Sequence, residues 1–303
     1  MAFLDHLIQI AVVLALGPLM LGVINKTKAR FGGRRGPPLL QAYHDLAKLL
    51  RKDSVTSRTT TWVFIAGPAV SLVAVLFAAL VVPVGPGPAL VRFSGDFVLF
   101  AYLFALGRFF TTSAALDTGS AFEGMGASRD VTYAAFAEVT VFFGLLALGA
   151  LSHSTSLSGM LGGLDAPTRL GATAPIVLIV AAFTIVLLAE NARIPVDDPN
   201  THLELTMIHE VMVLDHGGPA LGVILYGASV KLVVLSALLV KVALPPIDSA
   251  ALAWSVFVAL LLVVAVVIGV IESVMARLRL THVPALLVAA CLLAGFGFLL
   301  VVT

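Results

Sequence analysis

The sequence contains few charged residues and almost no cysteine. Charged residues make up 12% of its 303 residues, whereas soluble globular domains carry roughly 25%. The single cysteine, Cys291, excludes disulfide frameworks, CxxC zinc sites and thiolate-ligated iron–sulfur clusters within this chain. Hydrophobic residues, by contrast, account for 60% of the chain, and the mean hydropathy is +1.08. Because charge is costly to place in a bilayer, this composition predicts a polytopic membrane protein.

Eight segments are long and apolar enough to cross a bilayer as helices, which takes ~20 residues each. The expected spans are 4–24, 62–82, 97–115, 131–151, 172–189, 220–240, 250–271 and 283–302. The first is expected to stay as a helix rather than a signal peptide, because Asp5 and no basic residue stands at its start. We find no internal repeat of the kind that many secondary transporters contain. The prediction is one all-α membrane domain.

The basic residues fall mainly on one side of these spans. Loops 25–61, 116–130, 190–219 and 272–282 hold thirteen of the eighteen Lys and Arg residues, and the opposite loops hold only Arg92 and Arg169. By the positive-inside rule the basic side is cytoplasmic, which places both termini outside the cytoplasmic (inner) membrane. Twelve of the seventeen Asp and Glu residues lie in the same four loops. The polar chemistry is therefore expected on the cytoplasmic side.

The basic loop 25–61 contains a predicted amphipathic helix. Pro37 and Pro38 suit a helix start. Apolar residues then recur at helical spacing, namely Leu39, Leu40, Tyr43, Leu46, Ala47 and Leu50. The opposite face is polar, so the helix is expected to lie in the membrane interface.

Two interpretations of this loop stay open. It is either a positive anchor on anionic lipid or a docking surface for a soluble partner. The candidate docking residues are Arg34, Arg35, Lys48 and Arg51. Glycines around the first two permit close approach of another backbone, which favours docking.

Three ionisable side chains, Arg108, Glu138 and Lys231, lie inside predicted spans, where each costs ~3 kcal/mol or more. Arg108 and Glu138 each lie seven residues from the inner end of their span, ~10 Å deep at ~1.5 Å per residue. They can therefore pair, either as a structural ion pair or as part of a proton or ion relay. Lys231 is expected to meet a carboxylate or a water-filled cavity, or else a polar group of a neighbouring subunit.

The loop 190–219 is rich in groups that exchange protons. It contains the carboxylates Glu190, Asp197, Asp198, Glu204, Glu210 and Asp215 and the histidines His202, His209 and His216. Glu190 and Arg193 would share a face if the preceding helix ran on, after which prolines end it. From residue 201 the apolar spacing returns to helical period. Acids and histidines together at the mouth of a membrane domain indicate proton movement.

Other chemistries have weaker support in this loop. His202, Glu204, His209 and Glu210 could bind a metal, but HExxH is absent and no cysteine joins them. There is also no GxSxG motif for nucleophilic catalysis. Nothing in the sequence points to a nucleic-acid partner.

Several motifs carry a resemblance to a known family. These are the run Arg34-Arg35-Gly36-Pro37-Pro38-Leu39-Leu40-Gln41, then Asp45 and Lys48-Leu49-Leu50, then Glu190, Arg193, Pro195, Asp197, Pro199 and Glu204. Together they resemble subunit 1 of respiratory complex I and its hydrogenase relatives, along the whole chain. The run RIPVDDPNTHLELTMIHEVMVLDHGGP looks like the branch of formate hydrogenlyase subunit 4 and hydrogenase-4.

The loop departs from the complex I branch at three positions. Asp198 stands where that branch has Leu, and Asn200 and His202 stand where it has acids. In complex I these positions border the quinone chamber. The departure disfavours quinone binding by this chain.

The resemblance implies a subunit with no cofactor of its own. Nickel–iron and iron–sulfur centres would lie in partners: the large and small hydrogenase subunits and iron–sulfur subunits on the cytoplasmic side, with antiporter-like subunits in the bilayer. It further implies that a buried acidic path couples electron transfer to proton or sodium movement. The family's path positions fall on Glu138, Glu190, Arg193, Asp197 and Glu204, with Glu210 near another family acid but out of register.

The sequence leaves several functions open. The favoured one is a membrane subunit of a group 4 nickel–iron hydrogenase of the formate hydrogenlyase type. The alternatives are a quinone-site subunit of a complex I type enzyme, a stand-alone ion transporter, and a passive anchor whose acids are structural.

Overall fold

The described chain is all helical. A computed structural model describes residues 2–162, 164–198, 206–245, 247 and 249–303. Eight helices in it are long and apolar enough to cross a membrane. They lie within α1 (Ala2–Phe31), α3 (Trp62–Val81), α4 (Asp96–Asp117), α5 (Ala121–Ser152), α8 (Thr173–Glu190), α9 (Gly218–Ala243), α10 (Ala250–Val274), and η2 (Leu280–His282) with α11 (Val283–Val302). The predicted all-α architecture with eight spans is confirmed.

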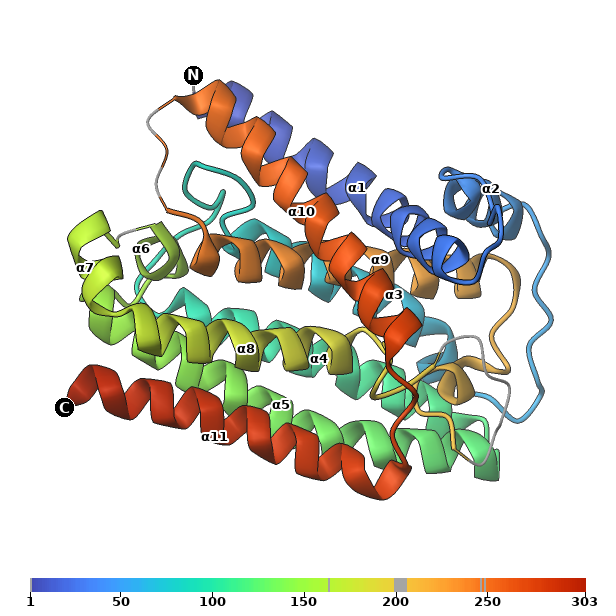
Figure 1. Cartoon of the computed structure of the whole chain (residues 1–303). Coiled ribbons are helices and arrows are strands. Elements are labelled where there is room, and N and C mark those ends of the chain that lie inside the picture. The colour runs from blue at the N-terminus through green and yellow to red at the C-terminus, as the bar shows by residue number, and fades with distance from the viewer. Residues whose placement is uncertain (1, 163, 199–205, 246, 248) are drawn as a thin grey trace.

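Helix α9 forms the centre of the bundle (Figure 1). Of its apolar stretch, 67% is buried inside the chain, against 22% for α4 and for α11, which lie at the periphery. α9 packs against α1, α3, α8 and α10. Close approach to α1 depends on Gly17, because a Cβ there would lie 2.7 Å from the backbone oxygen of Ser229. Small residues at such crossings bring membrane helices together.

The two ends of the bundle differ. One end carries α2 (Gln41–Leu49), and the other carries both chain termini with the short helices α6 (Leu157–Gly162) and α7 (Ala166–Gly171) (Figure 1). The amphipathic helix is thus present, about one turn shorter than its apolar spacing suggested. α6 and α7 were not predicted, because six-residue helices are too short to give a periodic pattern.

Three spanning helices extend beyond their predicted apolar segments. α5 begins at Ala121 rather than at residue 131, α1 continues to Phe31 rather than ending at 24, and α10 continues to Val274 rather than ending at 271. Hydropathy marks the part of a helix that lies in lipid, whereas the polar turns of these helices pack against other protein segments. The extensions carry charged residues of the site described below.

The expected return to a helix after residue 201 is wrong for the described part of that segment. Between residues 206 and 217 only the 3-10 turn η1 (Glu210–Val213) is helical. The reason is that the Asp197 carboxylate accepts the backbone N–H groups of Ile208 and His209, both at 3.1 Å. Amides held by a side chain do not enter an i→i−4 helical ladder.

Candidate functional site

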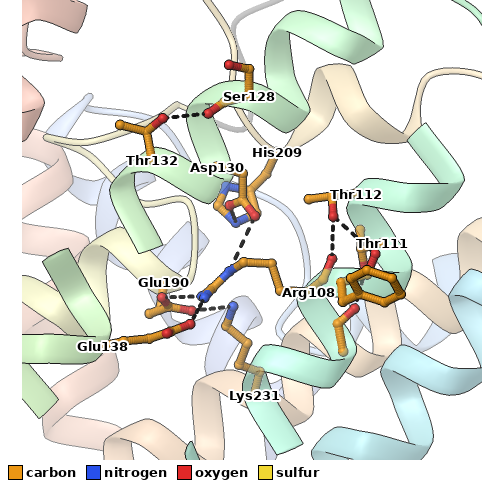
Figure 2. A network of polar contacts seen from close by, with 12 residues as sticks. Arg108, Thr111, Thr112, Ser128, Asp130, Thr132, Glu138, Glu190, His209 and Lys231 are labelled. Atoms are coloured by element: carbon orange, nitrogen blue, oxygen red, sulfur yellow. Dashed lines mark hydrogen bonds and ion pairs between the residues drawn. The ribbon is translucent and has the colours of Figure 1, made fainter. Parts of the chain in front are cut away.

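Arg108 is the centre of a buried group of charges (Figure 2). Its Nη1 pairs with Glu138 Oε1, its Nη2 lies 2.5 Å from Glu190 Oε1, and its Nε lies 3.4 Å from Asp130 Oδ2. Lys231 Nζ approaches the other oxygen of Glu190 at 2.8 Å. A planar guanidinium with five donors suits several carboxylates at once.

His209 completes this group from the loop that follows α8. Its Nε2 lies 3.2 Å from Asp130 Oδ1. We call the six side chains the Arg108 network: Arg108, Asp130, Glu138, Glu190, His209 and Lys231. They come from four spanning helices and one loop, so the network forms only in the folded bundle.

The members differ in how far they are enclosed. The side chains of Arg108 and Glu190 are 12% and 10% exposed, whereas that of Glu138 is 39% exposed. Glu190 therefore lies in the interior and Glu138 at the edge of the chain. Both contact the same guanidinium, so Arg108 bridges the interior to the edge.

A second cluster lies around Glu272 on α10. Lys28 Nζ is 2.7 Å from its Oε2, and Arg193 Nη1 is 3.3 Å from its Oε1. The expected sharing of a face by Glu190 and Arg193 is therefore wrong, because α8 ends at Glu190 and the chain turns away. Arg193 neutralises a carboxylate that is fully enclosed, at 0% side-chain exposure.

Asp197 organises the loop between α8 and α9. Besides the N–H groups of Ile208 and His209, its carboxylate accepts that of Asp198 at 2.9 Å and lies 3.0 Å from Arg277 Nη2. By fixing the backbone of His209 it also fixes the ring that contacts Asp130. Asp197 thus positions the network rather than belonging to it.

Three other predicted path residues are placed differently. Asp198 and Glu210 lie half-buried in the loop that carries His209, and neither is one of the six side chains of the Arg108 network. Glu204 lies outside the described residues. The structure thus brings Glu138, Glu190, Arg108 and Lys231 together, and leaves Arg193 and Asp197 in adjacent clusters.

The four candidate docking residues, Arg34, Arg35, Lys48 and Arg51, are all exposed. They lie on and beside α2. This short helix is attached to the bundle through Tyr43, whose hydroxyl donates to the backbone oxygen of Ala15 in α1. A basic surface is therefore held on a fixed element.

Two small cavities adjoin Glu190. One, of about 10 Å³, is lined in part by Asp130, Glu190 and His209; the other, of about 30 Å³, is lined in part by Arg108, Glu138 and Glu190. Volumes of this size correspond to roughly one or two waters. Within the described ranges no three His, Cys, Asp or Glu side chains gather into a possible metal site.

Sequence reasoning did not find Asp130, the contact of His209 with it, or Glu272. The sequence places Asp130 in a solvated loop because the predicted span begins one residue later. The signal that could have found it is the stretch before that span, rich in Gly and Ala, which continues the helix back to Ala121. Asp130 then falls about two turns from Glu138 on the same helix.

Comparison with known proteins assigns the chain to a family. The family model described as NADH dehydrogenase matches residues 5–303. The chain belongs to this family. Members similar to it include subunits of two hydrogenase systems and of NADH-quinone oxidoreductases.

The similarity covers nearly the whole length of the hydrogenase-type relatives. Formate hydrogenlyase subunit 4 of Escherichia coli (strain K12) is 33% identical over 98% of this chain and 96% of its own length. Hydrogenase-4 component C of the same organism is 30% identical over 90% and 87%. A subunit of the NADH-quinone oxidoreductase of Syntrophotalea carbinolica is 27% identical over 75% and 72%. The chain is thus a multi-pass membrane protein of the complex I subunit 1 type.

A solved structure has the same fold. A chain of the membrane-bound sulfane sulfur reductase, an archaeal respiratory membrane complex, superposes with a TM-score of 0.81 at 20% identity and 99% coverage of both chains. At that identity the likeness concerns the fold alone.

Proposed function

We propose that this chain is the membrane subunit of a nickel–iron hydrogenase complex of the formate hydrogenlyase type. In this role it holds the hydrogenase arm on the cytoplasmic membrane and couples electron transfer in that arm to proton or sodium movement. The redox centres would be in partner subunits. Antiporter-like membrane subunits would receive the ion or the conformational signal.

The charge balance of the Arg108 network carries this proposal. The network has three carboxylates, Asp130, Glu138 and Glu190, and two fixed cations, Arg108 and Lys231. With His209 neutral the charges sum to −1, and one bound proton brings the sum to zero. A buried group that alternates between these two states gains or loses one proton in a low-dielectric setting.

The surroundings of Glu190 support proton transfer. Its carboxylate is enclosed, contacts two cations and adjoins both small cavities. One water in each would link His209 and Asp130 on the loop side to Glu138 on the edge side. The path would thus run from the acidic loop into the bilayer.

The position of Glu138 supports a neighbouring membrane subunit. Its side chain is 39% exposed in a spanning helix, and a carboxylate facing lipid costs ~3 kcal/mol. A polar surface of another subunit packed over this part of α5 would remove that cost. It would also give the path an exit.

The two Escherichia coli relatives support the hydrogenase assignment, since their names place them in formate hydrogenlyase and hydrogenase-4. The alternative is a passive anchor in which the same charges only hold helices together. The two functions differ in what happens when Glu190 can no longer titrate.

The test compares Glu190→Gln with Glu272→Gln in sealed inside-out vesicles that contain the assembled complex. Glutamine keeps the size and hydrogen-bonding capacity of the side chain but does not titrate. Glu272 is an equally enclosed, ion-paired carboxylate outside the network, so it controls for the loss of a buried charge. Hydrogenase activity with an artificial electron donor reports assembly, and a fluorescent probe reports ion movement.

We expect both variants to keep donor-driven activity and only Glu190→Gln to lose ion movement. Glu138→Gln, at the edge of the chain, should behave like Glu190→Gln and serves if that variant assembles poorly. Normal ion movement in both network variants would leave the passive anchor as the function. Equal loss in Glu272→Gln would show a general effect of removing a buried charge.

A further inference from the structure

A polar pocket lies at the end of the bundle opposite the Arg108 network. It has a volume of about 630 Å³ and is lined by Arg92, Lys241, Ser154, Ser156 and Ser158, with Gly87 and other small residues. We call it the serine–lysine pocket. It lies where α9 ends and α5 gives way to a loop, the level at which lipid headgroups begin.

Lys241 is the least expected side chain in this pocket. The residue is only 9% exposed, and within the described part of the chain its ammonium has no ion pair or hydrogen bond. A buried ammonium without a counter-ion is costly. Lys231, ten residues earlier on the same helix, has Glu190 as its partner. An anion bound in the pocket would give Lys241 the partner that the described residues do not supply.

Two serines present hydroxyl protons to the same space. Ser158 Oγ accepts the backbone N–H of Ala89 at 3.0 Å, and Ser154 Oγ accepts that of Ser156 at 3.2 Å. Each hydroxyl thus uses an oxygen lone pair and keeps its own proton for another acceptor. The proton of Ser156 is already donated to Asp96, at 2.9 Å.

The local charge is positive. Arg92 lines the pocket from the loop before α4, and Arg169 lies close by, donating to the backbone oxygen of Val242 at 3.0 Å. Of the described carboxylates in these loops, Asp96 is fully buried and accepts the N–H of Leu157 at 2.6 Å, and Asp165 caps α7. Neither pairs with Lys241. The three basic residues of a sparsely charged end thus gather at one pocket.

We propose that the serine–lysine pocket binds a phosphate group. A buried ammonium, an exposed guanidinium and two hydroxyl donors are the groups that recognise an oxyanion. The pocket is also large enough for more than the phosphate, since one water takes roughly 30 Å³. The phosphate can belong to an anionic lipid headgroup or to free phosphate, which share this chemistry. The site is independent of ion coupling at the Arg108 network.

The test titrates the full chain in detergent with phosphatidylglycerol and with phosphatidylcholine, counts bound lipid by native mass spectrometry, and measures binding of radiolabelled inorganic phosphate by dialysis. Lys241→Met should weaken binding of the preferred phosphate ligand about ten-fold, the effect of losing one charge-assisted contact. Lys241→Arg should retain binding. Arg58→Gln, which removes an exposed charge at the opposite end, should change nothing.

The pattern across the probes identifies the source. Tighter binding of phosphatidylglycerol than of phosphatidylcholine, dependent on Lys241, supports a lipid headgroup; phosphate binding with the same dependence and no lipid preference supports a free anion. Ser154→Ala keeps every charge, so it remains informative if Lys241→Met does not fold, and it should weaken binding about five-fold. If neither the Lys241 nor the Ser154 variant changes binding of any probe, the proposal is wrong.

Discussion

Arg108 determines whether the buried carboxylates of the network are tolerated. It contacts three of them, and Lys231 contacts only Glu190. Removing one partner of a buried ion pair leaves an uncompensated charge, which typically costs more than the pair contributes. The stability of the bundle therefore depends on this side chain more than on any exposed charge.

Replacing Arg108 tests this dependence. We expect Arg108→Met to lower the free energy of unfolding by about 3–5 kcal/mol, and Arg108→Lys to lower it less because the charge remains but the forked contacts do not. Denaturant titration of the purified chain in mixed micelles measures both. Arg58→Gln, an exposed control, should stay within about 0.5 kcal/mol of the parent. A similarly small effect of Arg108→Met would mean that the carboxylates are already neutral.

His216 gives the protein a pH-sensitive contact outside the spanning helices. Its ring is buried and stacks on Phe64 at the start of α3, with ring centroids 3.9 Å apart. Burial lowers the pKa of His216 below its usual value, and the neighbouring Asp215 acts weakly in the opposite direction. The folded protein therefore keeps this imidazole neutral at a pH where the unfolded chain protonates it.

The sign of the pH effect follows from this difference. Below the ordinary histidine pKa, about 6.5, the unfolded state binds more protons, so the free energy of unfolding falls as pH falls and is unaffected above that value. His216→Phe keeps a stacked ring and removes the titration. Thermal unfolding at about pH 5.5 and about pH 7.5 should then show a smaller pH difference in the variant than in the parent. Equal differences would contradict the assignment.

At the scale of helices, sequence and structure agree where a segment is apolar and differ where polar turns are buried by protein. The eight spans were predictable because ~20 apolar residues have few alternatives. The start of α5 was not, since Glu123 and Asp130 indicate a solvated loop unless the packing around them is known. Both are buried in the fold. The irregular segment before α9 was likewise hidden, because hydrogen bonds to Asp197 come from residues distant from it in the sequence.

The attachment of α2 to the bundle depends on Gly22 of α1. A Cβ at this position would lie 2.0 Å from the backbone oxygen of Leu39, which leads into α2. That distance is far below any real contact, so Gly22→Ala must displace the segment. At Gly32, in contrast, an added Cβ would be 3.6 Å from its nearest neighbour, an ordinary contact.

We therefore expect Gly22→Ala, but not Gly32→Ala, to loosen the segment that contains α2. Limited proteolysis of membranes should cut loop 32–61 faster in the Gly22 variant, while the spanning helices stay protected. Thermal unfolding of the bundle should change less than the cleavage rate, because α2 contributes no buried residue. An unchanged cleavage rate would show that α1 and α2 can separate without exposing the loop.

At the scale of the whole molecule, the charged chemistry is concentrated at one end. The basic surface on and beside α2 lies at the same end as the acidic loop, whereas the termini, α6 and α7 lie at the other (Figure 1). This asymmetry was visible in the sequence as an uneven distribution of Lys and Arg. The convergence of Arg108, Glu190 and Lys231 was only partly visible, since helix contacts between residues far apart in sequence decide it.

The basic surface gives the last prediction. Changing Arg34, Arg35, Lys48 and Arg51 together to glutamate should release the soluble hydrogenase arm from membranes, because exposed interface charges govern association more than folding. The subunit should stay inserted, since other basic residues of the loop remain: Lys26, Lys28, Arg30, Lys52 and Arg58. Sedimentation of membranes followed by a hydrogenase assay of pellet and supernatant measures release. The matched control reverses Lys52 and Arg58, exposed charges of the same loop outside the proposed surface. An arm that stays bound at physiological salt in the fourfold variant would mean that the surface contacts anionic lipid rather than a protein, since screening at about 0.15 M already weakens exposed pairs.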